Sequence, residues 1–459
     1  MRVGVKTSAE LDDEILRLNG GFYLSSDRVL SEALRDWGGD HVSVADVARC
    51  YKGNIFKRIY VDDVEHSRPY ISASDLDRTD YWGCRRISTV HGALLNELEL
   101  RSGTTVITRS GVNLGWGALV RPDLDRVVGS DDLIRVVPNG EEDVGFIGAF
   151  LCSPVGRVAI RKYTYATSIK HIEPEHVALV KIPWFTEAER GRIGANFWRA
   201  AQNRSESYGL IQEATTLVFD SVGLSDLDEG EWHGLGREVG FVAQPNVHSL
   251  RGWNYSVRAT ALGDRIRGVG HSALEDLVVP GTLKKGPSFT RIDAVPPHSA
   301  QLIGQRQLFR YLPEGRQVSR TYLPARAFCK PGTVAIASVG TFGESEVFCR
   351  AQLVTERTAK WAYSNHVLRV VGKKGLSGWL YAFLRSRTAF RLLRSIATGS
   401  KQQDLHSEML AKLPVPIADA KTTKAVQELV DKASRLRDEA SRLEAEAFRE
   451  VRALLIGGE

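Results

Sequence analysis

The two halves of this chain repeat one another in sequence. Six short segments of the first half recur in the second half in the same order, at an offset near 232 residues, as from Leu18 to Leu250. Any one match is weak, but six in one order at nearly one spacing indicate two copies of one structural unit. The paired segments are 18–23 with 250–255, 70–76 with 302–308, 101–107 with 330–336, 130–137 with 364–371, 145–151 with 378–384, and 180–183 with 411–414.

Each copy has the pattern of a mixed α/β module. Short β-branched runs at 104–108 and 333–337 are bounded by Gly and Pro, as strands are. Apolar residues at helical spacing predict one helix over 144–157 and its counterpart over 376–396. A chain of 459 residues is also too long for one typical core, so several domains are expected.

Each module is followed by a segment with the apolar spacing of a long helix. The C-terminal segment alternates steps of three and four, as in a coiled coil, and the central segment has a similar face that Arg204 and Ser207 interrupt. The apolar positions are Leu429, Ala433, Leu436, Ala440, Leu443 and Ala447 in the C-terminal segment, and Ile193, Phe197, Ala200, Ile211, Ala214 and Val218 in the central one.

We therefore expect an α+β fold in which the two long helices pack as an antiparallel coiled coil and hold the modules apart with approximate twofold symmetry. The predicted divisions are a first module at 1–185, a central helix at 186–222, a connecting loop at 223–248, a second module at 249–417 and a C-terminal helix at 418–459.

The composition indicates which kinds of binding partner and which cellular compartment suit this chain. The net charge of +6 is compatible with a polyanionic partner, although a basic surface alone does not require one. The five cysteines are an odd number without CxxC spacing, which favours a reducing compartment over a disulfide framework or a zinc ribbon. Residues 1–10 lack an apolar signal core, and no window approaches about 18 uninterrupted apolar residues. We expect a cytoplasmic protein with no membrane span.

Sequence motifs for catalysis are absent. The chain has no GxxxxGK[ST] stretch, no HExxH pair and no GxSxG elbow. The stretch 296–298, Pro-Pro-His, lacks the Asn or Asp and the aromatic residue of an adenine methyltransferase motif. His171 and His176 lie beside acidic residues, and we interpret this segment as a polar loop rather than a metal site. We expect no enzymatic activity and no cofactor in this chain.

The stretch 397–405, Ala-Thr-Gly-Ser-Lys-Gln-Gln-Asp-Leu, leads to Leu-Pro-Val-Pro at 413–416 and then into a long helix. This pattern and the tandem module–helix layout resemble the specificity subunit of type I restriction–modification systems. The equivalent stretch of the first half, 165–172, departs from the pattern because the Gly-Ser-x-Gln core is missing there.

The resemblance implies two target-recognition domains, each reading half of an asymmetric bipartite site in double-stranded DNA. It implies that the helices set the spacing between the half-sites and hold two methyltransferase subunits. Those subunits bind S-adenosylmethionine and methylate adenine, and a restriction motor subunit joins them in some systems. None of that catalysis is expected in this chain.

Sequence readout requires Arg, Lys, Asn or Gln at base edges, together with basic and hydroxyl groups at phosphates. The loops after the matching strands and the polar stretch at 400–403 supply such residues. The alternative for each is a surface loop that touches nothing. The candidates are Arg109, Ser110, Asn113, Lys170 and His171 in the first module, and Ser338, Thr341, Ser400, Lys401, Gln402 and Gln403 in the second; Ser72, Ser74, Gln305 and Arg306 follow a further pair of matching strands.

An alternative function belongs to another class. The chain could be an assembly scaffold of a phage-defence complex whose modules bind protein without reading bases. The salt dependence of DNA binding distinguishes the two, because binding through phosphates weakens steeply as salt rises. A third alternative, a concealed nuclease or methyltransferase, would show metal- or cofactor-dependent activity in the isolated chain.

Overall fold

The computed structural model describes residues 28–456 apart from 62, 64, 82, 166–169, 238–239, 241–247 and 314. Three features of the sequence argument lie outside the described residues. They are the repeat segment 18–23, the centre of the stretch 165–172, and residues 238–239 and 241–247 of the connecting loop at 223–248.

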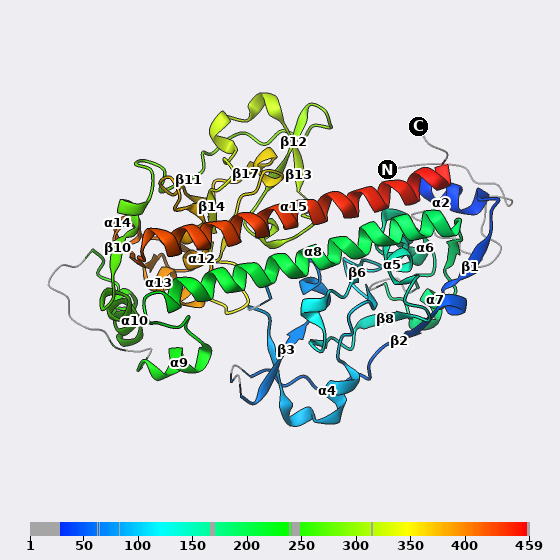
Figure 1. Cartoon of the computed structure of the whole chain (residues 1–459), viewed down its shortest axis with the longest axis horizontal. Coiled ribbons are helices and arrows are strands. Elements are labelled where there is room, and N and C mark those ends of the chain that lie inside the picture. Colours follow the sequence, from blue (N-terminus) through cyan, green and yellow to red (C-terminus); the bar gives the residue numbers. More distant parts are fainter. Residues whose placement is uncertain are drawn as a thin grey trace.

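Two long helices run side by side along most of the length of the molecule (Figure 1). Ion pairs between them join Arg192 to Glu450 at 3.0 Å and Glu206 to Lys432 at 2.7 Å. Residue numbers therefore increase along one helix as those of its partners decrease along the other. This confirms the predicted antiparallel pairing. The helices are α8 (Glu187–Asp220) and α15 (Ala420–Ile456).

The first module contains two main sheets. A four-stranded antiparallel sheet has the order β2-β8-β5-β6, and a three-stranded sheet has the order β4-β3-β7, in which β3 and β7 are parallel. A two-stranded pair, β1 with β9, lies next to the start of α8. The strands are β1 (His41–Ser43), β2 (Ala48–Tyr51), β3 (Ser67–Ile71), β4 (Arg86–Ser88), β5 (Thr105–Thr108), β6 (Gly117–Leu119), β7 (Val128–Gly129), β8 (Leu133–Pro138) and β9 (Lys181–Pro183).

The second module repeats this topology, which confirms the internal repeat. Its sheets have the orders β11-β18-β14-β16 and β13-β12-β17, with β12 and β17 again parallel, and β10 pairs with β21 as β1 does with β9. The strands are β10 (His271–Ala273), β11 (Lys284–Lys285), β12 (Ser299–Ile303), β13 (Arg316–Ser319), β14 (Val334–Ala337), β15 (Val339–Gly340), β16 (Ala351–Leu353), β17 (Ala362–Tyr363), β18 (Val367–Val370), β19 (Ala397–Thr398), β20 (Gln403–Leu405) and β21 (Pro414–Pro416).

Each predicted single helix at 144–157 and 376–396 is in fact two helices. Ser153 has extended backbone, as residues before proline prefer, and its hydroxyl accepts a hydrogen bond from Gly156 N at 3.1 Å, so it ends one helix and caps the next. Ser386 caps Ala389 N at 3.0 Å in the same way. The helices are α5 (Val144–Cys152) and α6 (Pro154–Arg161), and α12 (Ser377–Leu384) and α13 (Arg387–Ser395).

The remaining α-helices are short. They are α2 (Arg28–Asp36), α3 (Val44–Val47), α4 (Ala93–Glu97), α7 (Pro174–Ala178), α9 (Glu229–Gly234), α10 (Val257–Arg267), α11 (Leu274–Leu277) and α14 (Ser407–Ala411). No single helix of the described chain is long and apolar enough to span a membrane; the pair α5 and α6 meets that test only together, and it is bent by 71°.

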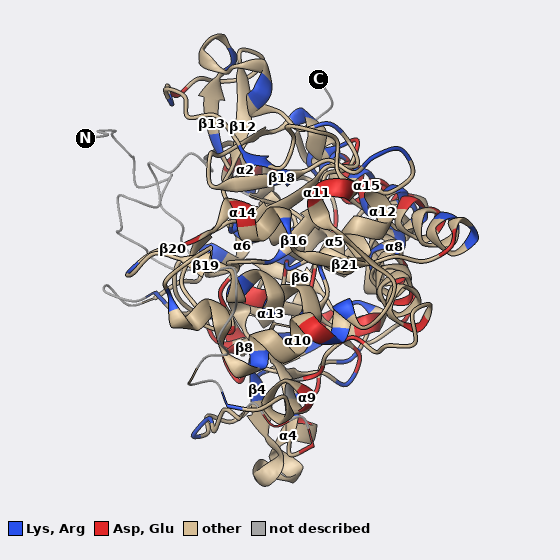
Figure 2. Ribbon diagram, turned by 90° about the vertical axis from the view of Figure 1, so that its left-hand side faces the viewer, with Lys and Arg blue, Asp and Glu red and all other residues tan. Residues whose placement is uncertain are grey.

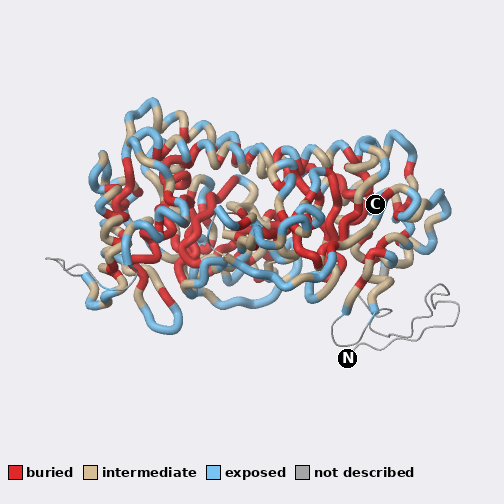
Figure 3. The backbone as a smooth tube through the Cα atoms, turned by 90° about the horizontal axis from the view of Figure 1, so that it is seen from below, coloured by how far each residue is buried: buried red, intermediate tan, exposed pale blue. Residues whose placement is uncertain are grey.

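Each module shares its hydrophobic core with one half of the helix pair, so buried residues form two groups, one on each side of the middle of the molecule (Figure 3). The first core includes Phe197 of α8 and Val451 of α15, and the second includes Val218 of α8 and Val430 of α15. All six predicted apolar positions of α8 are buried, whereas Leu429 and Leu436 of α15 are only partly buried.

The modules also touch each other near the middle of the helices, so α8 and α15 do not hold them apart along their whole length. Thr79 N donates to Phe309 O, and Tyr311 N donates to Asp77 O, both at 2.9 Å. At the repeat offset, Thr79 corresponds to Tyr311 and Asp77 to Phe309. The two hydrogen bonds are therefore equivalent, and they mark an approximate twofold axis between the modules.

Candidate nucleic-acid interface

In the second module, the predicted polar stretch forms the tip of a hairpin. Strands β19 and β20 pair with each other and with β15, and Ser400, Lys401 and Gln402 are exposed at the turn. Gly399 has φ of +104° and lies so close to Gln402 O that a Cβ atom would clash there, so the turn requires glycine. Figure 2 shows β19 and β20 on the side of the molecule opposite α8 and α15.

Two of the second module's candidates support this surface from within. Gln403 is 4% exposed; its side-chain oxygen accepts from Arg251 Nη1 at 2.7 Å, and its amide donates to Ser400 O at 2.8 Å. Ser338 is fully buried and donates to His366 O at 2.8 Å. Both side chains hold the hairpin and the preceding strand in place, and neither faces solvent.

Thr341 joins the exposed part of the same surface. Gly340 lies opposite Gln403 in the antiparallel register, so the next residue, Thr341, comes level with Gln402 at the edge of the sheet. Thr341 is exposed. The structure thus brings Thr341, Ser400, Lys401 and Gln402 together on one polar surface, called here the second hairpin surface. Its hydroxyl, amide and ammonium groups suit both base edges and phosphates.

The first module has the same arrangement in a less regular form. His171 forms antiparallel bridges with both Ser110 and Tyr165, as β20 does with β15 and β19. Tyr165 and His171 exchange backbone hydrogen bonds of 3.1 Å. Lys170 is exposed beside this bridge, and residues 166–169 lie outside the described residues. Lys170 and His171 therefore occupy the place that the second module gives to its hairpin.

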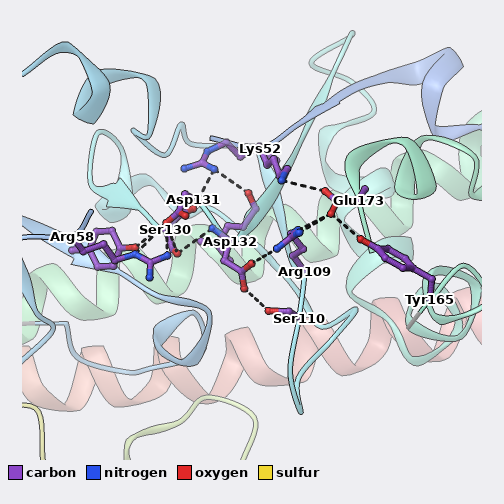
Figure 4. A network of polar contacts seen from close by, with 12 residues as sticks. Lys52, Arg58, Arg109, Ser110, Ser130, Asp131, Asp132, Tyr165 and Glu173 are labelled. Carbon is purple, nitrogen blue, oxygen red and sulfur yellow. Dashed lines mark hydrogen bonds and ion pairs between the residues drawn. The ribbon is translucent and has the colours of Figure 1, made fainter. Parts of the chain in front are cut away.

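Arg109 is held inside the first module by two carboxylates (Figure 4). Its Nη2 lies 2.6 Å from Glu173 Oε1, and its Nη1 lies 2.9 Å from Asp132 Oδ1. Ser110 donates to the other oxygen of Asp132 at 2.6 Å. Hydrogen bonds from Arg109 lower the pKa of the Glu173 carboxyl to about 2, so it is ionised at neutral pH.

Two further residues complete this network around Glu173. Lys52 Nζ lies 3.3 Å from Glu173 Oε2, and the Tyr165 hydroxyl donates to Oε1 at 3.0 Å. Through Glu173, the network ties the loop after β5 to Tyr165 and to Lys52 at the end of β2. Arg109 and Ser110 thus fix the shape of the loop, and their polar groups are already bonded within the module (Figure 4).

The loop tip beyond this network is open to solvent. Val112 is 96% exposed and Asn113 is also exposed. Within the described residues, no hydrogen bond of the Asn113 side-chain amide is found, and such an amide can pair with the edge of an adenine. Asn113 and Lys170 are therefore the first module's exposed polar groups among the candidates, and together they are called here the first loop surface.

Sequence reasoning missed the residues that hold these surfaces. Glu173 and Asp132 lie 64 and 23 residues from Arg109, and no local pattern links them. Arg251, the partner of Gln403, belongs to the repeat segment 250–255, which is the only sequence signal that pointed to it. Across the described chain, no group of three or more His, Cys, Asp or Glu side chains is arranged to hold a metal ion.

No family model matches the sequence, and no curated protein matches it. Three similar solved structures belong to type I restriction–modification systems. The S subunit from M. genitalium is 12% identical, with 91% of this chain and 94% of that chain covered and a TM-score of 0.38. The HsdS subunit from Thermoanaerobacter tengcongensis is 14% identical, with 92% and 97% covered and a TM-score of 0.27.

A third similar chain comes from a study of complex assembly and conformational transition of the type I R-M system. It is 14% identical, with 92% of this chain and 96% of that chain covered and a TM-score of 0.26. This chain is thus similar to S subunits over nearly all of its length. The TM-scores lie below 0.5, so the architecture and the candidate interface rest on the contacts described above.

Proposed function

We propose that this chain is a sequence-specific DNA-binding subunit that reads a bipartite site. The observation that carries the proposal is the pair of equivalent polar surfaces. The first loop surface and the second hairpin surface are built at equivalent places of the repeated module. In the first module the loop after β5 is bridged by His171, and in the second module β15, which follows β14, is bridged by β20. A twofold-related pair of such surfaces fits two segments of one duplex.

The helix pair supports two binding heads at a fixed separation. With 34 residues, α8 is about 50 Å long at about 1.5 Å per residue. Each module packs on its own end of the pair, so the heads have little freedom to slide. Half-sites separated by roughly one turn of the duplex, about 34–36 Å, match this frame.

The two heads present different side chains, so the two half-sites should differ. The first offers Asn113 and Lys170, and the second offers Lys401, Gln402 and Thr341. Arginine and lysine favour guanine or phosphate, whereas asparagine and glutamine favour adenine. Because the two modules are related by approximate twofold symmetry but present different side chains, we expect a bipartite site whose two halves differ in sequence.

The exposed side of the long helices is the proposed docking place for partner subunits. It carries charges of both signs in close alternation, as where Arg442 pairs with Glu439 at 2.7 Å and with Glu446 at 2.8 Å. In this proposal two methyltransferase subunits bind there and supply S-adenosylmethionine and the chemistry, and a restriction motor subunit can join them. The chain itself contributes recognition.

The test is to co-express the chain with the products of neighbouring genes and to sequence the host DNA for modified bases. The expected result is a methylated split motif that disappears when this gene is deleted. If the neighbouring proteins co-purify with the chain but no modification appears and no duplex is bound, the chain is an assembly scaffold of a defence complex instead.

A further inference from the structure

A cleft of about 430 Å³ lies between the two modules. Its walls include Ser74 and Arg85 from the first module and Arg306 from the second, and no residue of α8 or α15. A separate, smaller pocket reaches α8 and α15 through Tyr208 and Arg437, and the two cavities share Arg78 and Phe309 as walls. The cleft therefore lies across the module junction from the long helices.

The junction below the cleft marks the approximate twofold axis of the molecule. Arg78 and Arg310 occupy equivalent positions of the repeat, and they face each other in an antiparallel bridge. The flanking hydrogen bonds, from Thr79 N and Tyr311 N, are equivalent as well. Because the cleft shares Arg78 and Arg310 with this bridge, it lies at the axis that relates the two heads.

The cleft is continuous with the second hairpin surface. Gln305, next to Arg306, donates its side-chain amide to Val339 O at 2.8 Å and accepts from Val339 N at 2.9 Å. Val339 begins β15, which pairs with β20 of the hairpin. The loop that leaves β15 at Thr341 continues to Ser345 and Glu346, and both of these residues line the cleft.

The cleft also reaches the network that holds the first module's loop. Tyr70, another wall residue, donates its hydroxyl to Asp131 Oδ1 at 3.5 Å. The neighbouring Asp132 is the carboxylate that holds Arg109 and Ser110 (Figure 4). The cleft thus lies between the two candidate surfaces, and a duplex that reaches from one to the other would pass over it.

Two arginines of the cleft have guanidinium groups open to solvent. Arg306 is exposed, and within the described residues no ion pair or hydrogen bond of its side chain is found. Arg85 is exposed, and its guanidinium lies over the ring of Tyr60, 4.8 Å from the ring centroid. Arg78 and Arg310 are instead paired with Asp75 and Asp77.

We propose that this cleft binds the sugar–phosphate backbone of the duplex between the two half-sites, through Arg85 and Arg306. The inference rests on the proposed function. A duplex that contacts two twofold-related heads must cross the axis between them. Arginine forms strong, charge-assisted hydrogen bonds with phosphate oxygens, and such contacts position the duplex without reading its sequence. The spacer would therefore add affinity that does not depend on its bases.

The first experiment uses the full chain and a mixed-sequence duplex of about 40 base pairs, long enough to span both heads. Fluorescence anisotropy gives the Kd over a range of KCl concentrations for the wild type, Arg85→Ala, Arg306→Ala and the double variant. Each substitution should reduce the slope of log K against log salt by about 1 and weaken binding roughly five- to tenfold. Thermal melts establish that the variants remain folded.

Two matched variants control for charge and position. Arg306→Lys keeps the charge and should keep the slope. Arg435→Ala removes an exposed arginine from α15, across the molecule from the hairpin, and should change neither Kd nor slope. A double variant that keeps the wild-type Kd and slope would overturn the proposal.

A second experiment separates this inference from the proposed function. Once methylation sequencing has given the split site, neutral methylphosphonate linkages at the spacer centre should weaken wild-type binding and cancel the further effect of Arg306→Ala. If split-site binding is intact but the arginine variants behave as wild type, the cleft assignment alone fails. If the variants lose affinity but the neutral spacer does not, the arginines bind phosphates elsewhere. If no split site exists, the proposed function fails.

Discussion

Arg204 of α8 and Glu444 of α15 form an ion pair buried between the two long helices. Nη1 of Arg204 lies 3.1 Å from Glu444 Oε1, a second hydrogen bond joins Nη2 to Oε2, and the side chains are 11% and 6% exposed. The ring of Tyr311 from the second module covers the guanidinium at 4.6 Å. Arg204, which interrupts the apolar face of α8, thus contacts both α15 and the second module.

Replacement of one partner of this pair should destabilise the protein strongly. Glu444→Ala leaves the Arg204 guanidinium buried without its carboxylate, so the free energy of unfolding should fall by about 3–5 kcal/mol. The double variant Arg204→Met/Glu444→Leu leaves no isolated charge and should lose less than the single variant. Denaturant unfolding followed by circular dichroism measures both.

An exposed pair on the same helices provides the control. Arg192 and Glu450 lie 3.0 Å apart, and the Arg192 side chain is 56% exposed. Arg192→Ala should cost no more than about 1 kcal/mol because water screens this pair. A Glu444→Ala variant as stable as Arg192→Ala would show that the buried pair does not stabilise the helix packing.

The stability of the folded protein should depend on pH through Asp77, which lies at the junction of the two modules. Burial raises the pKa of the Asp77 carboxyl to about 6, although the neighbouring Arg310 guanidinium acts to lower it. In the unfolded chain the pKa is near 3.8. Between these values the folded protein keeps a proton that the unfolded chain has released, so stability should fall as pH rises from about 4 to 6.

Asp77→Asn should remove this part of the pH dependence. At about 1.4 kcal/mol per pKa unit, the difference in unfolding free energy between wild type and variant should change by about 2–3 kcal/mol across the window. Asp431→Asn, at an exposed position of α15, is the control and should leave the wild-type profile unchanged. Parallel profiles for Asp77→Asn and wild type would contradict the assignment.

The repeat and the apolar periodicity predicted most of the architecture. The matching segments that the structure describes became matching strands and helices, and the parallel pairs β3–β7 and β12–β17 recur as well. The seam of α8 was predicted residue by residue, because burial on a helix follows a period that one segment of sequence displays. The prediction of one helix over 144–157 was wrong because Ser153 and Pro154 end the first helix and begin the second. These two residues are a helix-breaking signal that is present in the sequence.

The candidate interface was predicted less well, because it depends on contacts between distant segments. Ser338 and Gln403 are polar and lie in the right region, but the pairing of β15 with β20 turns both inward. Asp77 and Arg310 lie 233 residues apart in the sequence, and no local pattern predicts their contact. Register and module docking are properties of the assembled fold, and they decide which polar residues of a loop reach solvent.

Arg109 and Asn113 should separate stability from recognition in the first module. Arg109→Ala leaves Glu173 and Asp132 without their shared cation, and it should lower the free energy of unfolding by about 1–3 kcal/mol. Asn113→Ala removes an exposed amide and should change stability by less than about 0.5 kcal/mol. Thermal or denaturant unfolding measures the difference. Equal stability of the two variants would show that the network around Glu173 does not hold the loop.

The second hairpin surface gives the corresponding test of recognition. Lys401→Ala and Gln402→Ala should each weaken binding to the intact split site by about 5- to 150-fold, the equivalent of about 1–3 kcal/mol for a base contact. Neither should change stability. Gln403→Ala should instead lower the melting temperature, because Arg251 Nη1 loses its 2.7 Å acceptor and keeps only the longer hydrogen bond to Ala397 O at 3.3 Å. The Kd is measured for the intact duplex and for one in which the second half-site is scrambled.

The scrambled duplex decides what the hairpin contacts. If Lys401 and Gln402 read bases, the wild type has already lost those contacts on the scrambled duplex, and the variants should then bind it as well as the wild type does. If the variants lose as much affinity on the scrambled duplex as on the intact one, the hairpin contacts phosphate, because backbone contacts weaken binding uniformly across sequences. Base readout by the second module would then have to come from Thr341 and the loop that follows β15.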